Sequence, residues 1–283
     1  MSSFRLYKSH DNELYAHTRQ NAPRQSQSQY TLSDRSLGGK TIGKAKIDVC
    51  LRRQMTRWGV RNGHSRRDQQ HCGLLVIQLS SVQDPSYKLR SMSGVVEFEG
   101  DITLGEVKPP TMSGAPSEKR MTTSAEVAPN VQAPGTTISG LNFSRSTEST
   151  RVDRWSFSAK KTTDAHGQYR QLCWTLEDHK DGSGSIFDRP INLYVEMFFE
   201  TRSPKPVKVT VDVEGKLRSR RAEMKRKWFT FAPEVACKGR PIEPRFPKRP
   251  QQLDTLRSIV MAEVWQANQD AIPEIVDLLP MPA

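Results

Sequence analysis

Apolar and polar side chains alternate along much of residues 152–215, and this pattern restricts the fold of the chain more than any other feature. Successive side chains of a β-strand point to opposite faces, so a period of two marks a strand with one buried and one wetted face. The pattern occupies residues 153–160, 171–177 and 207–214. Between them, Ile191–Phe199 is apolar on both faces, which predicts a strand buried on both sides.

The segments that join these strands are rich in turn residues. Asp181-Gly182-Ser183-Gly184 suits a tight hairpin, and Ser203-Pro204 ends one strand before the next begins. Earlier in the chain, residues 47–51, 74–79 and 92–98 also have strand patterns. Consecutive strands joined by short turns pair in antiparallel fashion. We therefore predict a mainly β fold, an antiparallel β-sandwich of about seven to nine strands.

Composition divides the chain into a core domain and polar segments. Only 35% of the 283 residues are hydrophobic and the mean hydropathy is −0.67, which predicts one core domain with long polar additions. We expect residues 1–40 to form a disordered basic tail and residues 41–250 to form the sandwich. Residues 105–150, dense in Pro, Ser, Thr and Gly, are expected to be a long disordered loop within it.

Residues 251–283 are predicted to form a C-terminal helix and tail. Apolar side chains recur there at helical spacing over residues 251–270, and Pro273 follows as a helix terminator. The apolar stripe consists of Leu253, Leu256, Val260, Val264 and Ala267. Such an amphipathic helix is expected to cover an edge or a face of the sandwich.

The setting predicted from the sequence is the reducing interior of the cell. The four cysteines are far apart, the chain starts without an apolar signal region, and no run approaches the roughly 20 apolar residues of a membrane helix. We expect free thiols, no transmembrane segment, and an intracellular protein, cytoplasmic and/or nuclear, that is not secreted.

Positive charge is concentrated in two parts of the chain. The formal net charge is +12, and residues 1–70 and 205–250 each carry 14 basic against 5 acidic side chains. Localised charge of this kind suits an anionic partner. An acidic protein surface, nucleic acid and anionic lipid head groups all remain open.

The strongest functional candidate in the sequence is the basic run over residues 216–227. It resembles a two-part nuclear import signal, and the aromatic side chains after it suggest base stacking as an alternative. A solvated loop or a protected strand edge explains the same composition. The candidate targeting or anion-contacting residues are Lys216, Arg218, Arg220, Arg221, Lys225, Arg226 and Lys227.

Three weaker patterns are not predicted to form sites. Residues 38–41, Gly-Gly-Lys-Thr, match only the end of a phosphate-binding loop: Asp34 occupies the place of its first glycine, and a strand follows instead of a helix. We expect a flexible entry to the first strand there. Potential metal ligands lack the paired spacing of structural zinc sites, so no metal is predicted. These ligands are Cys50, His64, His71 and Cys72.

Acids and bases that might serve hydrolysis lie in or beside predicted turns. Asp164 and His166, Asp178 and His179, and Ser183 belong to this group, but no Gly-x-Ser-x-Gly elbow accompanies the serine. Turn formation accounts for these residues without a reaction. We predict no catalytic residue and no cofactor, while an enzyme with a site assembled from loops remains an alternative.

Residues of the predicted sheet core resemble a loose group of fungal all-β proteins without known activity. The resemblance is carried by residues 155–157 and 172–176, Arg189, and residues 207–217. It implies an all-β fold and no particular chemistry. The leading hypothesis is therefore a non-catalytic intracellular binding or accessory protein. The alternative is a nuclear, nucleic-acid-associated protein that acts through residues 52–67 and 216–227.

Overall fold

Two antiparallel sheets of six strands each form the body of the protein, which confirms the predicted mainly β class. The computed structural model describes residues 34–61, 69–85, 87–127, 143–178, 186–201, 203–229, 237–239, 241–249 and 251–276. The first sheet contains β1 (Arg35–Ile42), β2 (Ala45–Leu51), β3 (Arg57–Arg61), β4 (Gln70–Val82), β6 (Ile102–Lys108) and β12 (Ile191–Phe199). The second contains β5 (Leu89–Glu99), β7 (Thr111–Ser113), β10 (Trp155–Thr163), β11 (Tyr169–Asp178), β13 (Lys208–Leu217) and β14 (Cys237–Lys238).

The first sheet is organised around the long strand β4. Along one edge β4 pairs with β12, and along the other it pairs first with β3 and then with β2. The chain therefore leaves β2, turns through residues 52–56, and re-enters the same edge of β4 as β3. The sequence did not indicate β3, β7 or β14, because strands of two to five residues are too short to show alternation.

The predicted hairpin between β11 and β12 is absent, because the two strands belong to different sheets. A short 3₁₀ helix, Ile186–Asp188, leads into β12, and the expected turn at residues 181–184 lies outside the described residues. β12 and β13 also belong to different sheets. The confirmed burial of β12 on both faces explains this arrangement: a strand apolar on both sides needs a central place in a sheet covered on both faces.

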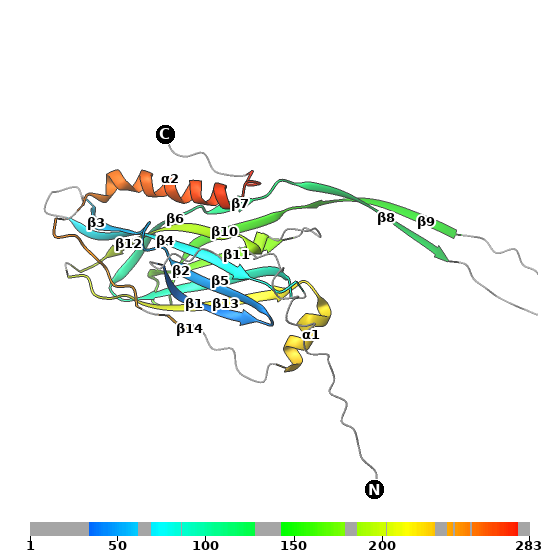
Figure 1. Cartoon of the computed structure of the whole chain (residues 1–283), viewed down its shortest axis with the longest axis horizontal. Coiled ribbons are helices and arrows are strands. Elements are labelled where there is room, and N and C mark those ends of the chain that lie inside the picture. The colour runs from blue at the N-terminus through cyan, green and yellow to red at the C-terminus, as the bar shows by residue number, and fades with distance from the viewer. Residues whose placement is uncertain are drawn as a thin grey trace, which may run out of the picture. The chain divides into compact units, whose positions relative to one another are not determined.

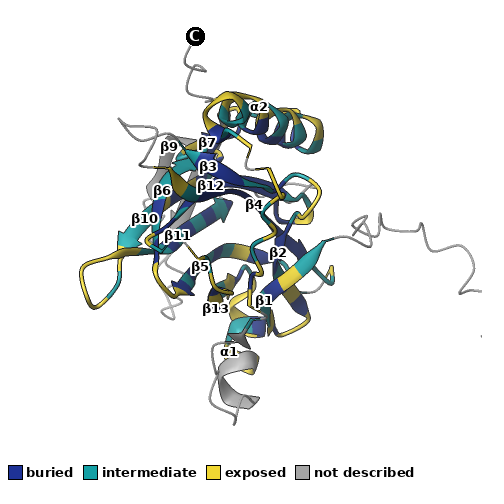
Figure 2. Ribbon diagram, turned by 90° about the vertical axis from the view of Figure 1, so that its left-hand side faces the viewer, coloured by how far each residue is buried: buried dark blue, intermediate teal, exposed yellow. Residues whose placement is uncertain are grey.

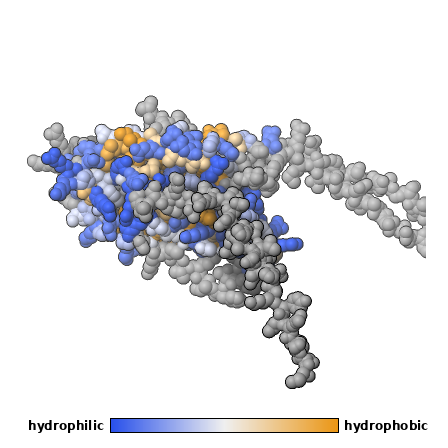
Figure 3. Space-filling model, in the orientation of Figure 1, coloured by the Kyte–Doolittle hydropathy of each residue, from blue (hydrophilic) through white to orange (hydrophobic). Residues whose placement is uncertain are grey.

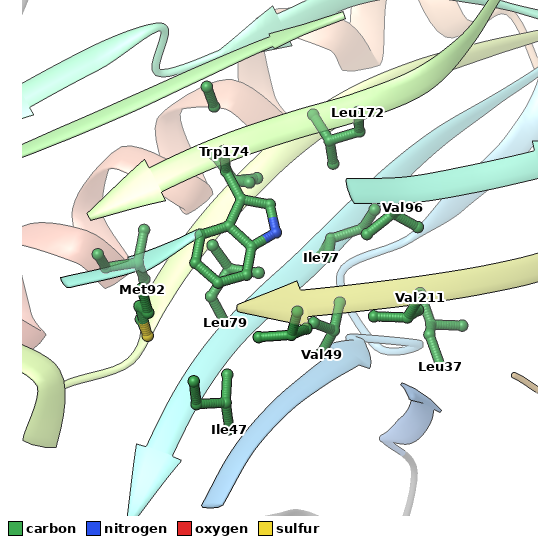
Figure 4. Packing of buried hydrophobic residues seen from close by; sticks show 14 of the residues in the cluster. Leu37, Ile47, Val49, Ile77, Leu79, Met92, Val96, Leu172, Trp174 and Val211 are labelled. Carbon is green, nitrogen blue, oxygen red and sulfur yellow. The ribbon is translucent and has the colours of Figure 1, made fainter. Parts of the chain in front are cut away.

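The core lies between the sheets (Figure 2) and is centred on aromatic side chains that the alternation placed correctly. Trp155 and Trp174 are each only 2% exposed. Figure 4 shows Trp174 of β11 projecting toward Leu79 of β4, so the indole bridges the two sheets. It also lies against Gly94 of β5, where a Cβ atom would come within 2.7 Å of Trp174 Cζ2. Glycine at position 94 is what lets the indole lie flat in the core.

Two predicted boundaries are wrong. Residues 105–150 are not one long loop: β6 and β7 belong to the two sheets, and β8 (Ser117–Val127) pairs with β9 (Phe143–Asp153) as a separate ribbon. The ribbon continues from the paired ends of β7 and β10 (Figure 1). Residues 128–142 lie outside the description. Backbone hydrogen bonds hold the two strands of this ribbon together, and polar residues can form them. The polar composition of the segment therefore did not indicate its strands.

The sheet also begins earlier than expected, because β1 starts at Arg35. Residues 38–41 are strand and not a flexible entry. Gly39 faces the carbonyl oxygen of Ile47 so closely that no Cβ atom fits, which explains the glycine without any phosphate chemistry. Residues 1–33 lie outside the described part of the chain.

Helix α2 (Leu253–Ala271) lies over the outer face of the first sheet (Figures 1 and 2), as predicted for the C-terminal amphipathic helix. Leu253, Val260 and Val264 are buried against β4 and β12. The sequence stripe missed Asn268, which is 1% exposed and pairs with Asn192 of β12. Its Oδ1 accepts a 2.8 Å hydrogen bond from the Asn192 backbone amide, and its Nδ2 donates to the Asn192 carbonyl at 2.9 Å.

Among the described residues, no helix combines the length and apolar character that crossing a bilayer requires.

Candidate anion-binding site

The structure divides the predicted basic run over residues 216–227 into parts with different surroundings. Lys216 lies one residue before the end of β13 and is exposed, whereas Arg218 is half-buried and forms a 3.4 Å ion pair with the buried carboxylate of Asp178. Helix α1 (Arg220–Phe229) follows, where a loop or strand edge had been considered. The Ser219 hydroxyl accepts the Ala222 amide hydrogen at 3.3 Å, which caps the first turn.

Exposed cations remain on α1. Arg220, Arg221 and Lys225 are exposed and form no ion pair with another described residue. The side chains of Arg226 and Lys227 lie outside the description, although their backbone is helical. Four of the seven candidate residues, Lys216 and these three, are therefore placed where an anionic partner can reach them.

In the second basic segment, residues 52–67, three of the four described arginines form ion pairs within the fold. Arg52 lies 2.9 Å from Asp34, Arg57 lies 3.8 Å from Glu263, and Arg61 lies 3.1 Å from Asp254. Two of these arginines belong to β3, so the predicted basic loop contains a strand. Arg66 and Arg67 lie outside the described residues. Within the described part of the segment, Arg53 alone is left without an acidic partner.

Arg53 opens onto a hollow of about 230 Å³ that gathers arginines from three separate segments. We call this hollow the arginine pocket. Its lining consists of Arg35, Leu51, Arg53, Thr56, Trp58, Ile242, Glu243 and Arg245. Like Arg53, the other two arginines form no ion pair with any described side chain. Three guanidinium groups against one carboxylate give the lining a formal charge of +2.

Strand register brings the first two arginines together. Arg35 of β1 lies opposite Leu51 of β2, and Arg53 follows two residues later in the turn toward β3. That turn is held firmly against β4: the Thr56 hydroxyl donates to the Arg52 carbonyl at 2.9 Å and accepts the Val76 amide hydrogen at 3.2 Å. The arginine pocket is therefore built on hydrogen-bonded backbone and not on a free loop.

The third arginine comes from the segment over residues 241–249, which packs on the sheet through two apolar side chains. Ile242 is buried, and its backbone exchanges hydrogen bonds of 2.9 and 2.7 Å with Val207. Phe246 lies 5.7 Å from the Trp58 ring in an edge-on arrangement. These contacts place Arg245, between them in sequence, beside the half-buried Trp58. Sequence spacing gave no signal for this site, because its members are joined only by register and packing.

A second concentration of charge lies beneath α2. Glu196 of β12 has a buried carboxylate, which lies 2.8 Å from Arg257 Nε and accepts a 2.8 Å hydrogen bond from the Tyr194 hydroxyl. The Glu106 amide also donates to it at 3.1 Å. Arg257 Nη2 contacts Glu106 as well. Because Arg257 of α2 pairs with Glu196 of β12 and Glu106 of β6, the arrangement attaches α2 to the sheet.

Burial also makes two thiols poor nucleophiles. Desolvation, with the nearby Glu196 carboxylate, raises the pKa of Cys72 to about 12. Desolvation and the Asp48 carboxylate raise the pKa of Cys50 well above its ordinary value. Within the described residues, no three His, Cys, Asp or Glu side chains are grouped as a metal site. His71 packs edge-on against Phe246 at 4.8 Å, and His64 is outside the description.

The predicted acids and bases have structural roles where they are described. Asp164 Oδ1 accepts hydrogen bonds from the amides of Gln168 (2.9 Å) and His166 (2.8 Å), which close a turn and lower the pKa of that carboxyl. Asp178 is held by Arg218. His179 and Ser183 lie outside the described residues. The turn interpretation is confirmed for Asp164.

Two further hollows, of about 440 and 340 Å³, adjoin on the outer face of the second sheet and share Thr175 and Glu177. Serine, threonine and glutamate side chains make up most of their lining. In the view of Figure 3, apolar surface gathers over α2, where Ile259 and Trp265 are exposed, and most of the other coloured surface is hydrophilic. The arginine pocket differs from both regions because three arginine side chains surround an apolar floor.

Comparison with known proteins adds little to this description. No protein-family model matches the chain, and no curated protein matches its sequence. Among 36 matching chains of solved structures is the Clostridium perfringens NetB toxin in its membrane inserted form. It is 8% identical, the match covers 64% of this chain and 83% of that chain, and the TM-score is 0.25. At that TM-score the likeness supports no conclusion about fold or function, and the resemblance to fungal all-β proteins stays a prediction.

Proposed function

We propose that this chain is a non-catalytic intracellular binding or accessory protein whose β-sandwich holds an anionic ligand in the arginine pocket. The observation that carries the proposal is the convergence of Arg35, Arg53 and Arg245, from three segments, without an acidic partner among the described residues. In the neighbouring turn and strand, by contrast, Arg52, Arg57 and Arg61 each lie within 4 Å of a carboxylate. Unpaired guanidinium groups around one hollow favour carboxylate or phosphate oxygens, which each fork can bind through two hydrogen bonds.

Binding is favoured over catalysis by the composition of the arginine pocket. Its lining contains one carboxylate, Glu243, and neither a histidine nor a cysteine. General acid–base or nucleophilic chemistry needs a titrating group beside a partner that activates it. Arginine stays protonated throughout the physiological range, so the three guanidinium groups can orient and hold an anion without moving a proton.

Removing the three charges should abolish selective anion binding. The variant Arg35→Gln/Arg53→Gln/Arg245→Gln is expected to elute from an immobilised polyanion at clearly lower salt, and the slope of log affinity against log salt should fall by about 2–3 because three cationic contacts are lost. Folding should change little, since surface substitutions usually alter the free energy of unfolding by about 0.5 kcal/mol or less. Salt-gradient retention and urea unfolding measure the two quantities.

A matched control separates local recognition from net charge. Arg90, Lys160 and Lys205 are exposed, lie outside the arginine pocket and have no described ion-pair partner. Changing these three to Gln removes the same total charge. Equal loss of retention in both triple variants would show that overall charge alone holds the polyanion, and the proposal would then be wrong.

Exposed Arg220, Arg221 and Lys225 on α1 favour a second candidate function, association with nucleic acid or an import receptor. Replacing the three with Gln should move a tagged protein from nucleus to cytosol, or weaken its retention on DNA at low salt, while leaving the melting temperature nearly unchanged. Imaging of the tagged variant measures the first effect, and retention on a DNA column measures the second. If both stay as in the parent, α1 is a solvated helix and this candidate is excluded.

A further inference from the structure

We propose that the arginine pocket takes the phosphate and base of a nucleoside monophosphate. The inference rests on the proposed function and names the class of its ligand. It draws on three properties of the lining: its formal charge, its apolar floor with the Trp58 indole, and the position of a single carboxylate among the cations.

The charge of the lining matches a phosphate monoester. Three arginines and one glutamate sum to +2, and a phosphate monoester carries about −1.5 to −2 near neutral pH. A ligand with a single carboxylate would leave a net charge of +1 on the lining. A tetrahedral phosphate presents three oxygens in different directions, which suits donors that arrive from β1, the turn after β2, and residues 241–249.

The floor of the pocket suits a flat organic group and not phosphate alone. Leu51 and Ile242 are buried there, and the half-buried Trp58 is also among the lining residues. Trp58 is held in place by Phe199 and Phe246, at ring-centre distances of 6.1 and 5.7 Å. A positioned indole beside guanidinium groups is a surface on which a nucleobase can stack. Inorganic phosphate would leave this apolar surface without a partner.

Glu243 distinguishes a nucleobase from other aromatic groups. Its carboxylate is exposed and has no ion-pair partner among the described residues. A carboxylate accepts hydrogen bonds, so it can bind the exocyclic amino group of an adenine base. The phenyl ring of phosphotyrosine carries no such amino group, so the Glu243 carboxylate would gain no hydrogen bond from it.

The test is calorimetric titration of the full chain with adenosine monophosphate, inorganic phosphate, adenosine and phosphotyrosine. Adenosine monophosphate should bind at least about tenfold more tightly than inorganic phosphate, because base stacking adds to phosphate binding. Adenosine should show no measurable binding, and phosphotyrosine should bind several-fold more weakly than adenosine monophosphate. The variant Arg35→Gln/Arg53→Gln/Arg245→Gln should lose binding of both phosphate compounds, whereas the Arg90/Lys160/Lys205 control should keep it.

Trp58→Leu tests the base. The ratio of the two affinities, adenosine monophosphate over inorganic phosphate, should fall about tenfold. Because both ligands are measured on one variant, a loss of folded protein cancels from the ratio. An unchanged ratio, equal affinities in the parent, or tighter binding of phosphotyrosine would each overturn the nucleotide assignment while the proposed anion-binding function stands. Failure of every phosphate compound, together with unchanged polyanion retention in the arginine variant, would reject both.

Discussion

Replacing Trp174 with alanine is expected to lower the free energy of unfolding by about 3–5 kcal/mol, the range for emptying a large buried aromatic site. The indole lies between the sheets and is 2% exposed, with Leu79 of one sheet and Met92 of the other beside it (Figure 4). The cavity has little means of closing, because the surrounding strands are fixed by their hydrogen-bonded registers. Urea unfolding monitored by circular dichroism measures the loss.

Thr175→Ala is the matched control for Trp174→Ala. Thr175 follows Trp174 in β11, and its side chain points to the outer face, so its removal should cost no more than about 0.5 kcal/mol. A Trp174→Ala variant that melts within a degree or two of the parent would contradict the central position of β11. Trp174→Phe should be milder than Trp174→Ala, since the indole N–H has no hydrogen-bond partner whose loss must be compensated.

The second large effect is expected from Arg257→Met, which should cost about 3 kcal/mol, the lower end of the range for removing one partner of a buried ion pair. Glu196 is 5% exposed and would lose the guanidinium that lies 2.8 Å from its carboxylate. Arg257 itself is about one third exposed, which is why the lower end applies. Its contact with Glu106 would also be lost, and with it part of the attachment of α2.

A double-mutant cycle isolates the pair. Glu196→Gln in the Arg257→Met background removes a buried carboxylate that has lost its 2.8 Å partner and keeps only Arg61 at 3.9 Å, so the double variant should be more stable than Arg257→Met alone. The Gln Oε1 can accept the Glu106 amide hydrogen, while its Nε2 can donate to the Tyr194 hydroxyl oxygen, which then accepts where it donated to Glu196. Arg90→Met, an exposed and unpaired arginine, serves as the control and should be nearly neutral. Strict additivity of the two substitutions would show that Glu196 and Arg257 do not stabilise each other.

Local periodicity was sufficient to identify most of the core. The alternation in β10, β11 and β13 placed Trp155 and Trp174 inside, and the spacing of Leu253, Val260 and Val264 placed α2 and its buried face within about two residues of its ends. These features depend on how side chains project from neighbouring residues, and that geometry is the same in every strand or helix.

The same pattern did not show which strands pair with each other. Alternation shows that β11 and β12 are strands, but it does not state that they belong to different sheets. The ribbon of β8 and β9 shows the opposite failure, since polar strands that bury little surface have no hydrophobic pattern to detect. Asn268 was missed for a related reason: an amide on the buried face is favourable only because Asn192 supplies its hydrogen bonds.

Charge shows most plainly what the sequence by itself determined and what the tertiary structure decided. Composition established a basic chain with two basic segments and an expectation of an anionic partner. It did not show that Arg52, Arg57, Arg61 and Arg218 pair with carboxylates of distant segments, because ion pairs depend on distances of about 4 Å between residues far apart in the chain. Only the β1–β2 register and the packing of Ile242 bring Arg35, Arg53 and Arg245 around one hollow. The sequence therefore determined the kind of partner to expect, and the fold decided which arginines remain to bind it.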